Sequence, residues 1–207
     1  MTHPLPAFAV LRPSSRDEAS AMLAAGARAL AGGTDLIPNL RRGLEQPARL
    51  VDLSRVPGLD GIDVTPTMLR LGAGLTLARL AGHEAVRTHL GALAEAAGQV
   101  AGPGHRSAAT LGGNLCQDTR CVFYNQSAWW REANGWCLKR APGAAPPTRP
   151  APQGGSSSPA EPDRLERGGA ICHVAPQGTR CHAACCSDLA PVLLAVGAQL
   201  EIATPQG

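Results

Sequence analysis

The chain has 207 residues, and its 19 lysines and arginines exceed its 16 aspartates and glutamates only enough to give a formal net charge of +3. This balance lacks the concentrated positive charge of a nucleic-acid or polyanion binder. The length allows one large domain or two small ones, each with its own hydrophobic core. We therefore expect a globular protein whose partners have to be inferred from motifs.

Neither end of the chain carries a targeting or membrane signal. Residues 1–13 lack the basic start, continuous apolar run and cleavage site of a secretory signal. The apolar run at residues 189–200 contains a proline and is too short to cross a bilayer. The sequence thus predicts a cytoplasmic protein with no membrane and no nucleic-acid partner.

Residues 1–56 alternate between strand and helix signals. Short strands are expected at residues 6–13, 29–30 and 48–54. The first helix begins after Ser15, and Glu18, three positions on, would complete a capping box. A second helix opens in AGGTDLIPNLRRG. The pattern predicts an N-terminal α/β lobe with parallel strands.

Residues 57–207 have a mixed character and predict a second lobe of α+β type. A strand is expected at residues 68–74, followed by helical pieces that break at Gly82 and Gly91 and by a loop that continues to residue 115. A helix followed by a strand is expected within residues 180–203. Residues 141–169 are rich in Pro, Gly, Ala and Ser, and we expect a disordered insertion there.

Two loops carry paired glycines, AGGTDL at residues 31–36 and ATLGGNL at residues 109–115. Glycines let the main chain turn sharply and approach a ligand, and N–H groups at a helix start favour an anion such as a diphosphate. Asp35 is expected to cap or orient the loop. Although such a turn is also ordinary turn chemistry, two of them favour one extended ligand, such as a dinucleotide.

Seven cysteines all follow residue 115, at positions 116, 121, 137, 172, 181, 185 and 186. Disulfides are rare in the cytoplasm and an odd number cannot pair completely, so ligation of a metal or iron–sulfur cluster is favoured. Four thiolates suit a tetrahedral zinc or a cubane cluster, and the spacing does not decide between them. Reduced cysteines packed in a core are the third possibility.

The segments LAGGTDLIPNLRRG, HRSAATLGGNLCQDTRC and SDLAP together resemble the flavin-binding medium subunit of the molybdenum hydroxylases. The resemblance implies a two-lobed FAD-binding domain of the PCMH or CO dehydrogenase flavoprotein type. His105-Arg106-Ser107 departs from the family's IRN. The implied FAD contacts are Ala31, Gly32, Gly33, Thr34, Asp35, Leu36, Ala101, Thr110, Gly112, Gly113, Asn114 and Asp188.

The segment CQDTRCVFYNQSAWWREANGWCLK, with CHV and RCHA after it, resembles the beta subunits of 4-hydroxybenzoyl-CoA reductases, which carry an additional 4Fe-4S cluster. The resemblance implies a cluster loop at residues 116–186, inserted in the second lobe. Five of the six aromatic residues lie within residues 120–137, where they would cover the cluster or form an ordinary aromatic core. The implied ligands are Cys121, Cys137, Cys172 and Cys181.

This resemblance implies an electron-transfer subunit that passes electrons from ferredoxin through 4Fe-4S and FAD toward 2Fe-2S and molybdenum centres. The partners would be a molybdenum-cofactor large subunit and a 2Fe-2S small subunit, in a hetero-oligomer that converts 4-hydroxybenzoyl-CoA to benzoyl-CoA. No acid–base pair or nucleophile motif is apparent, so no catalytic residue is predicted. The resemblance also implies a C-terminal truncation.

Two alternatives remain open from the sequence. The first is the FAD subunit of another molybdenum hydroxylase, of the xanthine or CO dehydrogenase type. The second is a non-enzymatic module in which the cysteines bind zinc and serve stability alone.

Overall fold

The computed structural model describes residues 4–139, 171–177 and 180–204, and these form two compact units. The first, the main unit, contains Leu5–Pro38, Gln46–Asp118 and the described residues from Cys186 onward. The second, the cysteine unit, contains Asn39–Glu45 and the described residues of Thr119–Cys185. The insertion expected at residues 141–169 lies outside the described residues, and the boundary expected at residue 56 stays a prediction.

The main unit begins with a three-stranded parallel sheet. Its strands are β1 (Ala9–Leu11), β2 (Arg28–Leu30) and β3 (Arg49–Asp52), in the order β1-β3-β2. The helices α1 (Arg16–Ala24) and α2 (Leu36–Arg41) alternate with them along the chain. β3 is the central strand, and its residues Leu50 and Val51, whose side chains point to opposite faces, are both fully buried. The predicted parallel arrangement is confirmed.

The start of α1 follows the predicted capping pattern only in part. Ser15 Oγ accepts a hydrogen bond from the Glu18 N–H at 3.1 Å, as a helix cap does. The Glu18 carboxylate, however, accepts from the N–H of Ser14 at 2.6 Å and from the Ser14 hydroxyl at 2.8 Å, rather than from Ser15. These bonds, the one from the Ser14 N–H first, lower the pKa of Glu18.

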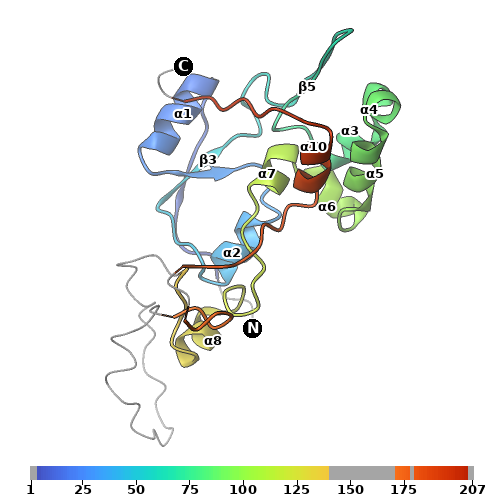
Figure 1. The fold of residues 1–207 in the computed structure, drawn as a ribbon. Coiled ribbons are helices and arrows are strands. Elements are labelled where there is room, and N and C mark those ends of the chain that lie inside the picture. The colour runs from blue at the N-terminus through green and yellow to red at the C-terminus, as the bar shows by residue number, and fades with distance from the viewer. Residues whose placement is uncertain (1–3, 140–170, 178–179, 205–207) are drawn as a thin grey trace, which may run out of the picture. The chain divides into compact units, whose positions relative to one another are not determined.

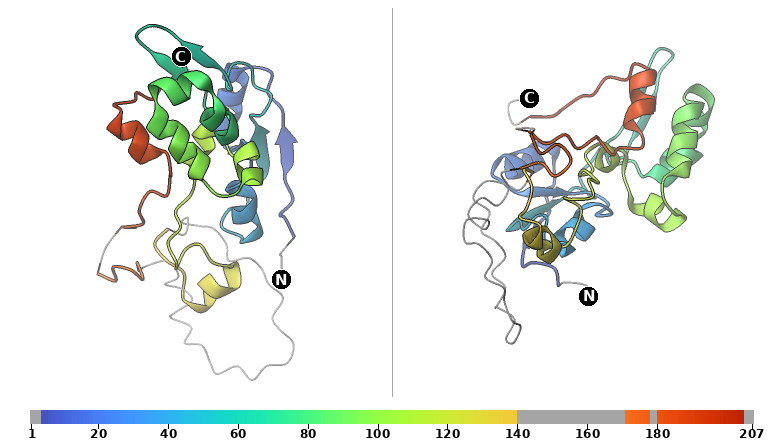
Figure 2. Two further views of the ribbon diagram at one scale, coloured as in Figure 1. Left: turned by 90° about the vertical axis from the view of Figure 1, so that its right-hand side faces the viewer. Right: turned by 60° about the horizontal axis from the view of Figure 1, so that its bottom comes forward.

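The second part of the main unit is an antiparallel ribbon followed by a group of helices. The ribbon pairs β4 (Ile62–Val64) with β5 (Leu69–Leu71), and the helices α3 (Leu77–Gly82), α4 (Glu84–His89) and α5 (Gly91–Gln99) follow. Figures 1 and 2 show these helices (green) packed together, away from the blue parallel sheet. The predicted breaks at Gly82 and Gly91 are confirmed. The fully buried residues of this core are Leu75, Leu77, Leu80, Val86, Leu93, Ala97 and Leu189.

Within the described residues, three short helices form where the sequence predicted none. They are α6 (Pro103–Ala108) and α7 (Leu111–Leu115), in the expected loop, and α8 (Ala128–Ala133), between Cys121 and Cys137. The prediction of a loop was wrong because helices of five or six residues are too short to show a hydrophobic period.

The strand expected after the last helix does not form. The helix α10 (Ala190–Ala195) is present as predicted, but residues 198–204 have no regular structure because no described strand pairs with them. The strand β4, in contrast, is present although no strand was predicted at its residues.

The helices in the described part of the chain are short, and the longest, α1 and α5, have nine residues each. Isolated helices shorter than about 12–15 residues are marginal in water, so these depend on packing against neighbouring elements. No helix within the described ranges is both long and apolar enough to span a membrane.

We expect Leu80→Ala to lower the free energy of unfolding by about 2–5 kcal/mol, because it removes a fully buried side chain and leaves a cavity among α3, α4 and α5. Urea unfolding followed by circular dichroism would measure the change. Leu194→Ala is the matched control: this α10 side chain is 79% exposed, and its loss should change stability by less than about 0.5 kcal/mol. Equal effects of the two changes would contradict the assignment of the core.

Candidate functional site

The two paired-glycine loops lie against each other in the main unit. A Cβ atom added to Gly32 would lie 1.8 Å from the carbonyl oxygen of Ala108, at the end of α6. A Cβ on Gly113 would be in contact with Ala31, at 4.0 Å from its Cβ. Gly33 has a φ of +71°, a left-handed conformation that favours glycine. The structure thus brings together the two loops that the sequence predicted to share one ligand.

Polar side chains within these loops hold the main chain in place. Asp35 Oδ2 accepts a hydrogen bond from the Asp118 N–H at 2.9 Å, which agrees with the orienting role expected for Asp35. Thr110 Oγ1 caps α7 by accepting from the Gly113 N–H at 3.1 Å. Both predicted site residues therefore fix loop geometry.

Asn114 joins the second glycine loop to the start of α10. Its buried amide oxygen accepts from the Ser187 hydroxyl at 2.9 Å and from the Leu189 N–H at 3.1 Å. Its Nδ2 donates to Asp188 Oδ2 at 2.7 Å. The predicted residues Asn114 and Asp188 are thereby brought into direct contact, and Ser187 joins them although no role was predicted for it. Its place in the SDLAP motif was the available signal.

Ala101 has an unusual main-chain conformation that a neighbouring arginine supports. Its φ is +44°, which costs a non-glycine residue about 1–2 kcal/mol. Arg106 Nη1 donates to the carbonyl oxygens of Ala101 at 2.6 Å and Val100 at 2.9 Å. In the sequence, Arg106 stands out only as part of a departure from the family pattern. In the structure it fixes the turn that carries a predicted ligand contact.

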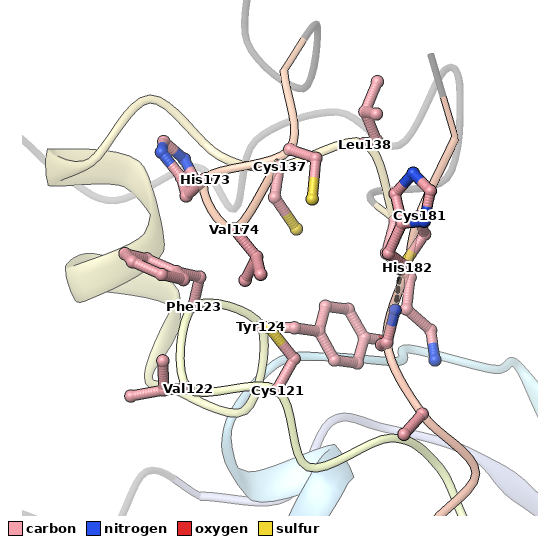
Figure 3. Close-up of a pocket in the computed structure, with 14 residues that line it drawn as sticks. Cys121, Val122, Phe123, Tyr124, Cys137, Leu138, His173, Val174, Cys181 and His182 are labelled. Atoms are coloured by element: carbon pink, nitrogen blue, oxygen red, sulfur yellow. Dashed lines mark hydrogen bonds between the residues drawn. The ribbon is translucent and has the colours of Figure 1, made fainter. Parts of the chain in front are cut away.

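The four cysteines predicted as ligands line one cavity of about 260 Å³ in the cysteine unit. Figure 3 shows Cys121 and Cys137 approaching this space from different segments, with Phe123 and Tyr124 beside it. Cys116, Cys185 and Cys186 do not line the cavity. Across the described residues, no three or more His, Cys, Asp and Glu side chains converge as a single metal ion requires. The four thiols therefore border a cavity and do not meet at a single point.

The thiols of this cavity differ in their surroundings. Burial raises the pKa of the Cys137 thiol, and a hydrogen bond from the Lys139 N–H and, more weakly, the charge of Arg131 oppose this effect. The pKa of Cys172 is lowered by hydrogen bonds from the N–H groups of Ala175, at 3.4 Å from the sulfur, and of Val174. Such N–H groups stabilise the thiolate, the form that binds metals.

The aromatic residues near the cysteines form a cover that is incomplete. Tyr124 and Trp136 are buried, and the Phe123 ring stacks on His173 with centroids 5.1 Å apart. Trp129, in contrast, is 59% exposed, so the prediction that all five rings supply buried area around the cysteines is wrong for this residue. Trp129 lies in α8, a helix that was not predicted and whose buried residue is Arg131.

The parallel sheet, the group of helices and the converging glycine loops are the features expected of a flavin-binding domain of the PCMH type. Residues 6–207 match the family described as "FAD binding domain in molybdopterin dehydrogenase". The chain belongs to this family, and the predicted fold class is confirmed.

Among its relatives is the aldehyde oxidoreductase FAD-binding subunit PaoB of Escherichia coli K12, 33% identical over 204 residues, which are 97% of this chain and 57% of that protein. The carbon monoxide dehydrogenase medium chain of Hydrogenophaga pseudoflava is 35% identical over 113 residues, 53% of this chain and 39% of that one.

A similar solved structure is quinoline 2-oxidoreductase from Pseudomonas putida 86, with a TM-score of 0.52 and 35% identity over 54% of this chain and 40% of that one. The chain thus spans 57% of the length of PaoB and about two fifths of the other two relatives.

We expect Gly32→Ala to destabilise the protein by at least about 1–3 kcal/mol, because its Cβ would overlap the Ala108 carbonyl, a main-chain group that cannot turn aside. The control is Gly104→Ala in α6, where a Cβ meets no atom within 4 Å. That change should leave stability unchanged or raise it by up to about 1 kcal/mol. Urea unfolding would compare the two, and a tolerated Gly32→Ala would contradict the close approach of the loops.

Proposed function

We propose that this protein is the FAD-binding part of an electron-transfer subunit of a molybdenum hydroxylase. The observation that carries the proposal is the meeting of the two glycine loops in a chain of this family. Main-chain N–H groups of the first glycine loop suit a diphosphate, whereas the N–H groups of Gly112 and Gly113 donate within the fold, to the Ala73 carbonyl and to Thr110 Oγ1. In this proposal FAD is held by the residues predicted from the sequence, with residues 31–36 and Thr110, Gly112 and Gly113 beside the diphosphate.

The chain's own side chains have a positioning role in this site. Arg106 holds the turn at Ala101, Asp35 holds the first loop, and Asn114 holds Asp188. When bound, FAD supplies the electron storage and transfer that amino-acid side chains lack. The protein's task in this proposal is to bind and orient it, and the absence of a catalytic residue stays a prediction.

We also propose a 4Fe-4S cluster in the cysteine unit, with Cys121, Cys137, Cys172 and Cys181 as its ligands. A structural zinc holds four thiolates at about 2.3 Å from one ion. The four thiols here border a cavity of about 260 Å³ instead, and a cubane takes its four thiolates around a larger body. The size of this space favours the cluster over the zinc alternative.

The comparisons favour another molybdenum hydroxylase over a 4-hydroxybenzoyl-CoA reductase. The alignment with the aldehyde oxidoreductase subunit covers 97% of this chain and so runs through the cysteine unit, whereas that with the carbon monoxide dehydrogenase chain covers 53%. We therefore propose an aldehyde or an aromatic heterocycle as the substrate class of the complex. The benzoyl-CoA reaction stays a prediction.

For the partners, we propose a large subunit with the molybdenum cofactor and a small subunit with 2Fe-2S centres. Ferredoxin as the electron carrier and a cytoplasmic location remain part of this proposal.

The chain purified without oxygen should contain one flavin and about four iron atoms, with as many sulfides, per molecule. Cys137→Ala should lose most of the iron and keep the flavin, because Cys137 lines the cavity of the cysteine unit and the glycine loops belong to the main unit. Iron, sulfide and flavin assays would measure this.

Cys185→Ala is the matched control, since Cys185 is exposed and lies outside the cavity, and it should keep both groups. A colourless protein with one zinc would refute both the proposed FAD site and the proposed 4Fe-4S cluster.

A further inference from the structure

Arg131, in α8, is a buried cation. Only 5% of the residue is exposed, and arginine is rarely buried to this extent without partners. Its guanidinium donates hydrogen bonds to three carbonyl oxygens, those of Gly43 at 2.7 Å, Gln126 at 3.3 Å and Arg42 at 3.4 Å. These acceptors offset part of the cost of removing the charge from water.

The same guanidinium supports a strained tryptophan. It lies over the ring of Trp136, with the guanidinium carbon 4.9 Å from the ring centroid. Trp136 has a φ of +60°, which is a rare conformation for a bulky residue, and its N–H donates to the Arg131 carbonyl at 2.8 Å. Arg131 therefore contacts Trp136 through both its side chain and its main chain, and these contacts offset the strain.

Trp136 in turn connects two segments that carry cysteines. It directly precedes Cys137, and its carbonyl oxygen accepts a hydrogen bond from His173 Nε2 at 2.5 Å. His173 directly follows Cys172 and stacks on Phe123. A continuous set of contacts thus runs from Arg131 to two of the segments that line the cavity.

We propose that Arg131 is a positioning residue for the metal centre of the cysteine unit: through Trp136 it fixes the segments of Cys137 and Cys172, and its buried charge makes the centre easier to reduce. This inference rests on the 4Fe-4S cluster of the proposed function. Reduction adds one negative charge to the centre, and the potential of such a cluster depends on nearby charge and on exposure to solvent. A buried cation is screened less by water and salt than an exposed one.

The test compares three variants of the full chain, each loaded with iron and sulfide without oxygen. Arg131→Gln removes the charge and keeps a donor for the carbonyls, whereas Arg131→Lys keeps the charge and loses the planar group that stacks on Trp136. Arg120→Gln is the control, because Arg120 is exposed and directly precedes Cys121. The midpoint potential is measured by redox titration followed by electron paramagnetic resonance.

We expect a shift to more negative potential in Arg131→Gln, a potential close to that of the unmodified chain in Arg131→Lys, and no shift in Arg120→Gln. Arg131→Lys should nevertheless lose iron faster in air, since the stacking on Trp136 is gone. The inference is overturned if Arg131→Gln keeps the original potential, or if the lysine variant shifts as far as the glutamine variant.

If neither Arg131 variant retains iron, Trp136→Phe and Trp136→Gly decide the matter. Phenylalanine keeps a ring beneath the guanidinium, whereas glycine relieves the strained φ but removes the ring. The inference requires faster iron loss from the glycine variant, and equal rates overturn it. An unmodified chain that takes up no iron refutes the proposed function instead, so the two failures are distinguishable.

Discussion

The close approach of Gly32 to the carbonyl of Ala108 is the constraint on which the arrangement of the main unit depends. Any side chain at position 32 would occupy the space of a main-chain oxygen, so the two glycine loops can meet only because this residue lacks a Cβ. Asn114 then adds a third segment through its hydrogen bonds to residues 187–189. Three distant parts of the chain converge there, and none of them could form the proposed flavin site alone.

The parts of the fold that the sequence predicts are those with a strong local signal. The Ser15 cap and the breaks at Gly82 and Gly91 depend on one or two residues each, and the structure has all three. The helices α6, α7 and α8 were missed because tertiary contacts, not periodicity, stabilise such short elements. The strand expected near the C-terminus failed for a related reason, since a strand needs a partner in addition to a suitable sequence.

In the candidate site, too, residues with a strong local signal could be predicted, and residues that act through tertiary contacts could not. Cysteines and paired glycines indicate their chemistry by residue type, so they could be chosen as candidate site residues from the sequence alone. The structure brings the four cysteines around one cavity. Arg106 and Arg131 could not be assigned in this way, because each acts by donating to main-chain carbonyls whose positions are set only by the folded chain. An arginine in a sequence carries no sign of whether it will be buried.

The orientation of the Asn114 amide has a consequence for the chemical ageing of the protein. Its oxygen faces two donors and its nitrogen faces the Asp188 carboxylate, so the two ends of the amide cannot be exchanged. Deamidation would replace the donating nitrogen by an oxygen and place two carboxylates side by side, where like charges repel. Deamidation of Asn114, which adds only about one mass unit, would then loosen the link between the second glycine loop and α10.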